Sequence, residues 1–343
     1  MRTTNGTASH GSGPVIRLCD ADAGAQASPC PAAWSRGRPG DLAVSYGHRD
    51  LQRMGIGLLQ ALASIGILVF SVCTMLTVGL SHTLRELLGP LRDSRGLVRA
   101  LMANFILVPL LAYGVVQVLP LDRSYATGVL LIGTGAGALF LVRLTAVAGG
   151  NMPLSASLTV LLMLATVLYM PLMVPRMVPD VSVRPAAIAL PLLWTMILPL
   201  GAGLYVRARH PTLAQRLRPG LGKLAMVALA VLVAATLAAN FGGVVRIIRT
   251  GAILAPLILI PGAFGIGWVL GREYRGGHVV LGLGTGQRNI AAAMVVATQG
   301  MGDPNAELMV VVSSLVGFAV LFPIAWLLAR RSRVRALSRA PVT

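Results

Sequence analysis

Nine apolar runs constrain this chain more than any other feature of its sequence. Each is close to the roughly 20 residues that a helix needs to cross the hydrocarbon layer of a bilayer. With 55% hydrophobic and 12% charged residues, the chain is too apolar for a soluble domain of its size. We therefore predict an all-α, multi-pass protein of the cell membrane. The nine predicted spans are residues 56–80, 96–119, 124–148, 153–175, 186–206, 221–241, 248–271, 277–299 and 305–329.

The two ends of the chain differ in composition from the apolar part. Residues 1–53 are rich in Gly, Ser, Pro and Arg without an apolar period, which predicts a disordered tail. Residues 54–330 form the predicted transmembrane domain, with the halves of a core repeat at about 96–175 and 248–329. Residues 331–343 form a basic tail. Met54 directly precedes the first run, so the sequence leaves open whether residues 1–53 are translated.

The positive charges are distributed unevenly between the two faces of the predicted bundle. Lys and Arg concentrate in the connections after the first, fifth and seventh runs and in the C-terminal tail. Cytoplasmic connections carry this excess, so we expect a cytoplasmic C-terminus and an N-terminus outside. The net charge of +18 is then explained by topology, and we expect no nucleic-acid partner.

A Gly-Thr-Gly motif interrupts the third run and recurs in the eighth. The two runs are five apart and therefore cross in opposite directions, which predicts an inverted repeat. Paired interruptions in two hydrophobic halves indicate discontinuous helices that meet at a transporter's binding site. The residues that we expect to break the helices are Gly133, Gly135, Gly137, Gly284 and Gly286.

Three polar residues follow the second interruption at once. Burying Arg288 near the middle of a span costs roughly 2.5 to 3.5 kcal/mol, so a functional role is expected. The amide end of a broken helix beside an arginine favours an anion, whereas the carbonyl end coordinates a cation. Close helix packing through small residues is the alternative. The residues predicted to line a midplane site for an organic anion are Arg288, Gln287, Asn289, Thr285 and Thr134.

The remaining chemical groups exclude several functions. All 11 acidic residues fall in tails, loops or helix ends, which argues against a carboxylate proton relay and an intramembrane enzyme. We predict no catalytic residue. Three cysteines suggest neither a disulfide framework nor a metal site. Ser155 and Thr159 share one helical face and either offer hydroxyls to an ion or bond to their own helix.

From about Ser71 to Arg330 the chain resembles the bile acid:sodium symporter family. The resemblance is carried by MLTVGLSHTLRELL, by the stretch from Asn104 to Pro109, by AGGNMPLSASLT and by LGTGQRNIAAAMVVA. It implies a panel domain and a core domain, with the two broken helices crossing in the core. It also implies sodium-driven uptake of an organic anion by alternating access.

The resemblance also implies particular ion-binding positions. The family's sodium-binding hydroxyls match Ser155 and Thr159, but its acidic ligand falls on Gly284 and a glutamine falls on Arg288. The resemblance makes Na⁺ the candidate coupling ion, at Ser155, Thr159 and Gly284, but the missing acidic ligand leaves sodium coupling open. No other cofactor is expected. The sequence leaves open whether a fixed charge at Arg288 takes over the ion's electrostatic role.

The leading interpretation is a secondary transporter whose partners are a small organic anion and the lipid bilayer. One alternative is an exporter of an inorganic or neutral solute such as arsenite, for which Cys73 is the one cysteine within a predicted span. A channel or structural protein is less favoured, because a duplicated and interrupted half would then have no purpose. The sequence specifies neither the substrate, nor the direction of transport, nor the oligomeric state.

Overall fold

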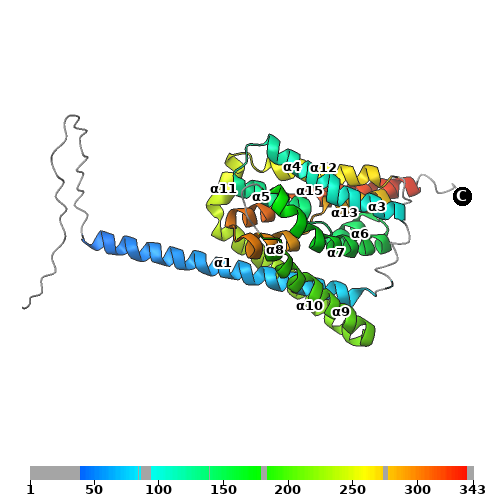
Figure 1. Cartoon of the computed structure of the whole chain (residues 1–343), viewed down its shortest axis with the longest axis horizontal. Helices are drawn as coiled ribbons and strands as arrows, with labels where there is room; N and C mark the ends of the chain where they lie inside the picture. Colours follow the sequence, from blue (N-terminus) through cyan, green and yellow to red (C-terminus); the bar gives the residue numbers. More distant parts are fainter. Residues whose placement is uncertain are drawn as a thin grey trace, which may run out of the picture. The chain divides into compact units, whose positions relative to one another are not determined.

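The computed structural model describes residues 39–83, 85, 94–138, 140–178, 184–272 and 277–337 (Figure 1). Every regular element in these residues is helical. The chain divides into two units, Met1–Asp50 and Leu51–Thr343. All the helices after the first belong entirely to the second unit, and this unit holds the site described below.

The first half of the chain contains both continuous and interrupted helices. Short π-helical turns, labelled η, continue some of them without a gap. In chain order these elements are α1 (Pro39–Ser81), α3 (Ser94–Met102), η2 (Ala103–Leu107), α4 (Val108–Val118), α5 (Arg123–Thr134), α6 (Phe140–Ala148) and α7 (Met152–Met177).

The second half repeats this mixture. Its elements are α8 (Pro185–Leu192), η3 (Leu193–Ile197), α9 (Leu198–Arg209), α10 (Pro211–Ala239), α11 (Phe241–Arg249), α12 (Leu254–Leu270), α13 (Gly277–Gly286), α14 (Ile290–Val295), η4 (Val296–Met301) and α15 (Pro304–Leu337).

The helices extend further at both ends of the chain than predicted. α1 begins at Pro39, so residues 39–53 are helical where a disordered tail was expected. Proline suits the first position of a helix, and the apolar run that follows lets the helix propagate from there. α15 likewise continues to Leu337 through part of the expected basic tail. Residues 1–38 and 338–343 lie outside the described residues.

The helices agree with the predicted spans in position, although the count of nine is not confirmed. Among the described residues, 7 helices are long and apolar enough to cross a membrane. An eighth span arises if α11 and α12, which meet at 75°, are taken as one. The predicted span at 124–148 is divided between α5 and α6, and each of these is too short to cross alone.

Two helices are interrupted where the repeated motif predicted discontinuity. Residues 135–138 separate α5 from α6 and form the first break, whereas Gln287–Asn289 separate α13 from α14 and form the second. The amide of Asn289 donates to the carbonyl oxygen of Gly135 at 3.0 Å. The two interrupted helices therefore meet at their breaks, as expected for crossed discontinuous helices.

Only some of the glycines that were predicted to break the helices lie in the breaks. Gly133, Gly284 and Gly286 are helical, and only Gly135 and Gly137 lie within a break. A Cβ atom at Gly284 would lie 2.9 Å from Leu141 Cδ2, and one at Gly133 would collide with Ala112. These helical glycines thus permit close packing between neighbouring helices, and the chain leaves helical geometry just after them.

Within the second unit, the part of α1 around Gly66 and Gly79 packs against α10 and α9 (Figure 1). A Cβ atom at Gly203 would lie 2.9 Å from the Cα atom of Gly79, so α1 and α9 approach backbone to backbone. The Ser71 hydroxyl adds a hydrogen bond of 3.3 Å to the Thr195 carbonyl oxygen in η3. On the other side of the bundle, α5 packs extensively on α15, and α12 on α13.

Candidate functional site

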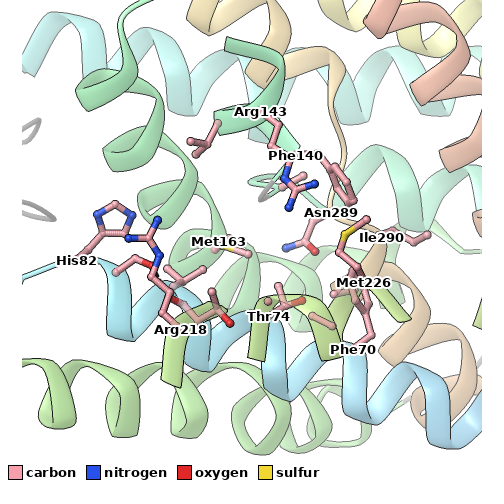
Figure 2. A pocket seen from close by; sticks show the side chains of 18 residues that line it. Phe70, Thr74, His82, Phe140, Arg143, Met163, Arg218, Met226, Asn289 and Ile290 are labelled. Carbon is pink, nitrogen blue, oxygen red and sulfur yellow. Dashed lines mark hydrogen bonds between the residues drawn. The ribbon is translucent and has the colours of Figure 1, made fainter. Parts of the chain in front are cut away.

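A cavity of about 400 Å³ lies between α1 and α10 on one side and the two breaks on the other. We call it the central cavity. Figure 2 shows Phe70, Thr74 and Arg218 facing Arg143 and Asn289 across it. Its full lining is Phe70, Thr74, Thr77, Val78, Ser81, His82, Ala138, Phe140, Val142, Arg143, Met163, Arg218, Gly222, Ala225, Met226, Asn289, Ile290 and Ala291.

Most of the central cavity is apolar, with a few polar groups placed in its wall. Phe70, Phe140, Met163 and Ile290 contribute apolar surface (Figure 2). Among the polar groups, the buried hydroxyl of Thr74 has no hydrogen-bond partner. A mainly apolar cavity with a small number of polar groups is typical of a site for a small organic ligand.

Two guanidinium groups give the central cavity a positive character. Arg143 of α6 and Arg218 of α10 both line it and are both exposed. In the described part of the chain, no acidic side chain forms an ion pair with either. Both arginines, together with Lys223, also line an adjoining depression of about 850 Å³. The site thus presents positive charge beside apolar surface.

Arg288 lies in the crossing itself, buried and surrounded by oxygen atoms. Its Nε donates to the Ile132 carbonyl oxygen at 3.0 Å, and its Nη2 donates to that of Gly133 at 2.6 Å. Its Nη1 donates to Asn104 Oδ1 at 2.9 Å and to the Thr285 carbonyl oxygen at 3.2 Å. The guanidinium therefore satisfies acceptors on the two interrupted helices and on the π-helical turn η2, and it does not line the central cavity.

The five predicted substrate residues are not gathered at one surface. Asn289 alone lines the central cavity, where its amide also donates to the Ala136 carbonyl oxygen at 3.3 Å. Gln287 and Arg288 line a separate buried space of about 10 Å³. The Thr134 hydroxyl bonds to carbonyl oxygens of its own helix. The Thr285 hydroxyl accepts a hydrogen bond from Asn104 at 3.2 Å.

The predicted ion-binding positions have mixed surroundings. The Thr159 hydroxyl donates to the Ser155 carbonyl oxygen at 2.9 Å. Of the two predicted alternatives, Thr159 therefore follows the one in which the hydroxyl bonds to its own helix. The buried Ser155 hydroxyl has no hydrogen-bond partner. Gly284 is packed against Leu141 and Leu158. Apolar groups therefore occupy the space that a larger side chain at Gly284 would need.

Sequence reasoning missed several residues that build the site. Asn104 was not among the predicted site residues, but it accepts a hydrogen bond from Arg288 across 184 positions of the chain. Its place as a lone amide within an apolar run was the available signal. Thr166 of α7, which bonds to the first break, and Arg218 had no comparable signal, because each depends on which helices are neighbours.

Crossed discontinuous helices beside a ligand-sized cavity define an architecture found in secondary transporters. The chain matches the model of the Sodium Bile acid symporter family over residues 67–247, more than half of its length. It belongs to that family, which is one of transporters. The match includes the first break, and the second break lies beyond it.

Two relatives agree with this assignment. The chain is 25% identical over 247 residues to "Probable sodium/metabolite cotransporter BASS1, chloroplastic" of Arabidopsis thaliana, covering 71% of this chain and 61% of that protein. It is 24% identical over 206 residues to "Uncharacterized sodium-dependent transporter YocS" of Bacillus subtilis (strain 168), covering 60% of this chain and 63% of that protein. The chain thus spans less than two thirds of the length of these relatives.

Proposed function

We propose that this protein is a secondary transporter that moves a small organic anion by alternating access through the central cavity. The observation that carries the proposal is the pair Arg143 and Arg218 in the wall of an otherwise largely apolar cavity that abuts both breaks. The names of the two relatives support a transport function in general. The anion and the mechanism belong to the proposal.

The charge of the cavity favours an anion over a cation or a neutral solute. Arg143 and Arg218 both line the wall of the same cavity (Figure 2). The nine-residue helix α6 begins at Phe140 in the cavity wall, and the positive end of a half-helix favours negative charge. The apolar wall in turn suits a hydrocarbon body. The expected substrate is an organic acid that carries its charge at one end.

The cavity is expected to open toward the cytoplasm. His82 directly follows α1, and Arg218 lies near the start of α10. The stretches of chain around both are rich in arginine, as is typical of the cytoplasmic ends of spans. The structure then corresponds to an inward-facing state, with the N-terminus outside and the C-terminus inside. An outward-facing state would require α1 and α10 to shift relative to the breaks.

Within this proposal Asn289 contacts the substrate and Arg288 positions the breaks. Asn289 lines the cavity and caps α14 by accepting a hydrogen bond from the Ala292 amide at 3.1 Å. Arg288 is 4% exposed and its guanidinium is surrounded by four oxygen atoms. The arsenite-exporter alternative gains no support, because Cys73 is buried and does not line the central cavity.

The proposal is tested by transport in proteoliposomes. A thermal-shift screen of organic carboxylates and sulfonates, including a bile acid, would select a ligand, and counterflow of that labelled ligand would then be measured. Losing a hydrogen bond to a charged group costs about 1.5 to 3 kcal/mol, so Arg143→Ala or Arg218→Ala should weaken binding about ten- to hundredfold.

The matched control is Arg216→Ala, because Arg216 is exposed on the same helix as Arg218 but does not line the cavity. This variant should transport like the wild type. The proposed substrate class would be refuted if the double variant Arg143→Ala/Arg218→Ala showed the same counterflow as the wild type. It would also be refuted if the protein transported only cations.

A further inference from the structure

The guanidinium of Arg288 sits where the C-terminal ends of two half-helices converge. Ile132 and Gly133 belong to the last turn of α5, and Thr285 to the last turn of α13. Their carbonyl oxygens, together with Asn104 Oδ1, accept hydrogen bonds of 2.6 to 3.2 Å from Arg288. Three carbonyl oxygens and one amide oxygen thus surround a single positive charge.

Such a convergence requires a cation on electrostatic grounds. Each helix C-terminus carries a partial negative charge of about half an elementary unit, and its last carbonyl groups have no partner within the helix. Two of these ends meet in a buried, low-dielectric crossing, where unpaired carbonyl groups are costly. In transporters with broken helices, such unwound carbonyls and half-helix ends coordinate Na⁺.

We propose that Arg288 is a built-in replacement for a coupling cation at this crossing, so that the protein binds and transports its substrate without Na⁺ there. The inference rests on the proposed transport function and departs from the two relatives, whose names include sodium. Because the guanidinium is covalently attached, it cannot be released into the cytoplasm with the substrate. The sodium gradient then does no work at this position, and transport runs by uniport or exchange.

The surroundings of Gly284 agree with this inference. This glycine lies one residue before Thr285 in the same turn of α13, and Leu141 and Leu158 are the nearest groups to its missing side chain. In addition, all 11 acidic residues lie outside the central parts of the spans. Among the described residues, no carboxylate forms an ion pair with Arg288 at the crossing, so none restores the attraction for a second cation.

The inference is tested by thermal unfolding of the purified full-length protein in nanodiscs, without substrate. The melting temperature is compared in NaCl, KCl and choline chloride at equal ionic strength. The wild type should show no increase that is specific to Na⁺. The Arg288→Ala variant should melt at a lower temperature than the wild type. The four oxygen atoms that lose the guanidinium should then form a cation site, so Na⁺ or added guanidinium chloride should raise the melting temperature of the variant by several degrees.

Arg288→Lys keeps the charge but reaches fewer acceptors, and it should be intermediate in stability and insensitive to Na⁺. A Na⁺-specific increase in the wild type overturns the inference, and this measurement stands even if the variants do not fold. An Arg288→Ala protein that folds but responds to neither cation also overturns it. Since no substrate is used, these results are independent of the counterflow test of the proposed function.

Discussion

The Thr166 hydroxyl donates to the carbonyl oxygen of Ala136 and accepts from the amide of the same residue, each at 2.9 Å. A single side chain of α7 thus satisfies both backbone groups of one residue in the first break. Neither group has a helical partner, because the chain is not helical there. The hydroxyl acts as a substitute for the missing turn of helix, and it fixes the break at one place on α7.

Replacement of this hydroxyl should therefore be costly. Thr166→Val keeps the volume but leaves the buried amide of Ala136 unpaired and leaves its carbonyl oxygen with only the longer hydrogen bond from Asn289, at 3.3 Å, which should lower the free energy of unfolding by about 2 to 4 kcal/mol. Thermal or denaturant unfolding in nanodiscs measures the change. Thr145→Val is the matched control, since the Thr145 hydroxyl is buried without a partner and its loss should be neutral or stabilising. Equal destabilisation by both substitutions would contradict the assigned role of Thr166.

Gly137 should not tolerate a side chain. Its φ is +76°, and a Cβ atom would lie 2.7 Å from the Thr159 carbonyl oxygen and collide with the Met163 amide. Gly137→Ala should lower stability by about 2 to 5 kcal/mol, the sum of left-handed strain and overpacking. Gly149 has a φ of +66° but open space around it, so Gly149→Ala should show only the strain of about 1 to 2 kcal/mol. Similar losses at both positions would mean that the contact with α7 is unimportant.

Asn104 should be important through its contact with Arg288. Asn104→Ala removes one acceptor of the buried guanidinium and should cost about 1.5 to 3 kcal/mol of unfolding free energy. The control is Asn240→Ala, because Asn240 also bonds to the carbonyl oxygen four residues before it but contacts no charged group in the described residues. The two melting temperatures are compared in the same nanodiscs. A larger loss at Asn240 would argue against a stabilising contact between Asn104 and Arg288.

The central cavity should be filled with water and open to one side of the membrane. In a background with all three cysteines replaced by alanine, Met226→Cys should react with a membrane-impermeant thiol reagent, since only a hydrated thiol ionises readily. Met226 lines the cavity and is 38% exposed, whereas Leu224 on the same helix is 48% exposed without lining it. Leu224→Cys should remain unlabelled if Leu224 faces lipid. Labelling of Leu224→Cys at the same rate would show that the cavity does not determine access.

The helical spans and their interruptions were predictable because they depend on neighbouring residues. Apolar runs of membrane-spanning length specify helices, and α7 and α15 agree with their predicted starts to within one residue. The paired motifs marked both breaks, although the exact break positions differ by a few residues. The disorder expected as far as residue 53 is not found for residues 39–53, because their polar composition did not prevent them from joining α1. The chain nevertheless divides into its two units close to the predicted boundary, between Asp50 and Leu51.

The sequence by itself determined that the chain forms apolar helices and that two of them are interrupted, because both follow from local composition. It also determined that Arg288 must find partners within the membrane, because an unpaired buried charge is costly. Only the tertiary structure decided which partners it finds and which residues line the central cavity. Asn104 reaches Arg288, and Arg143 and Arg218 line one cavity, through the packing of helices far apart in the chain. Such contacts arise from the summed shapes of many side chains, and no local pattern of residues encodes them.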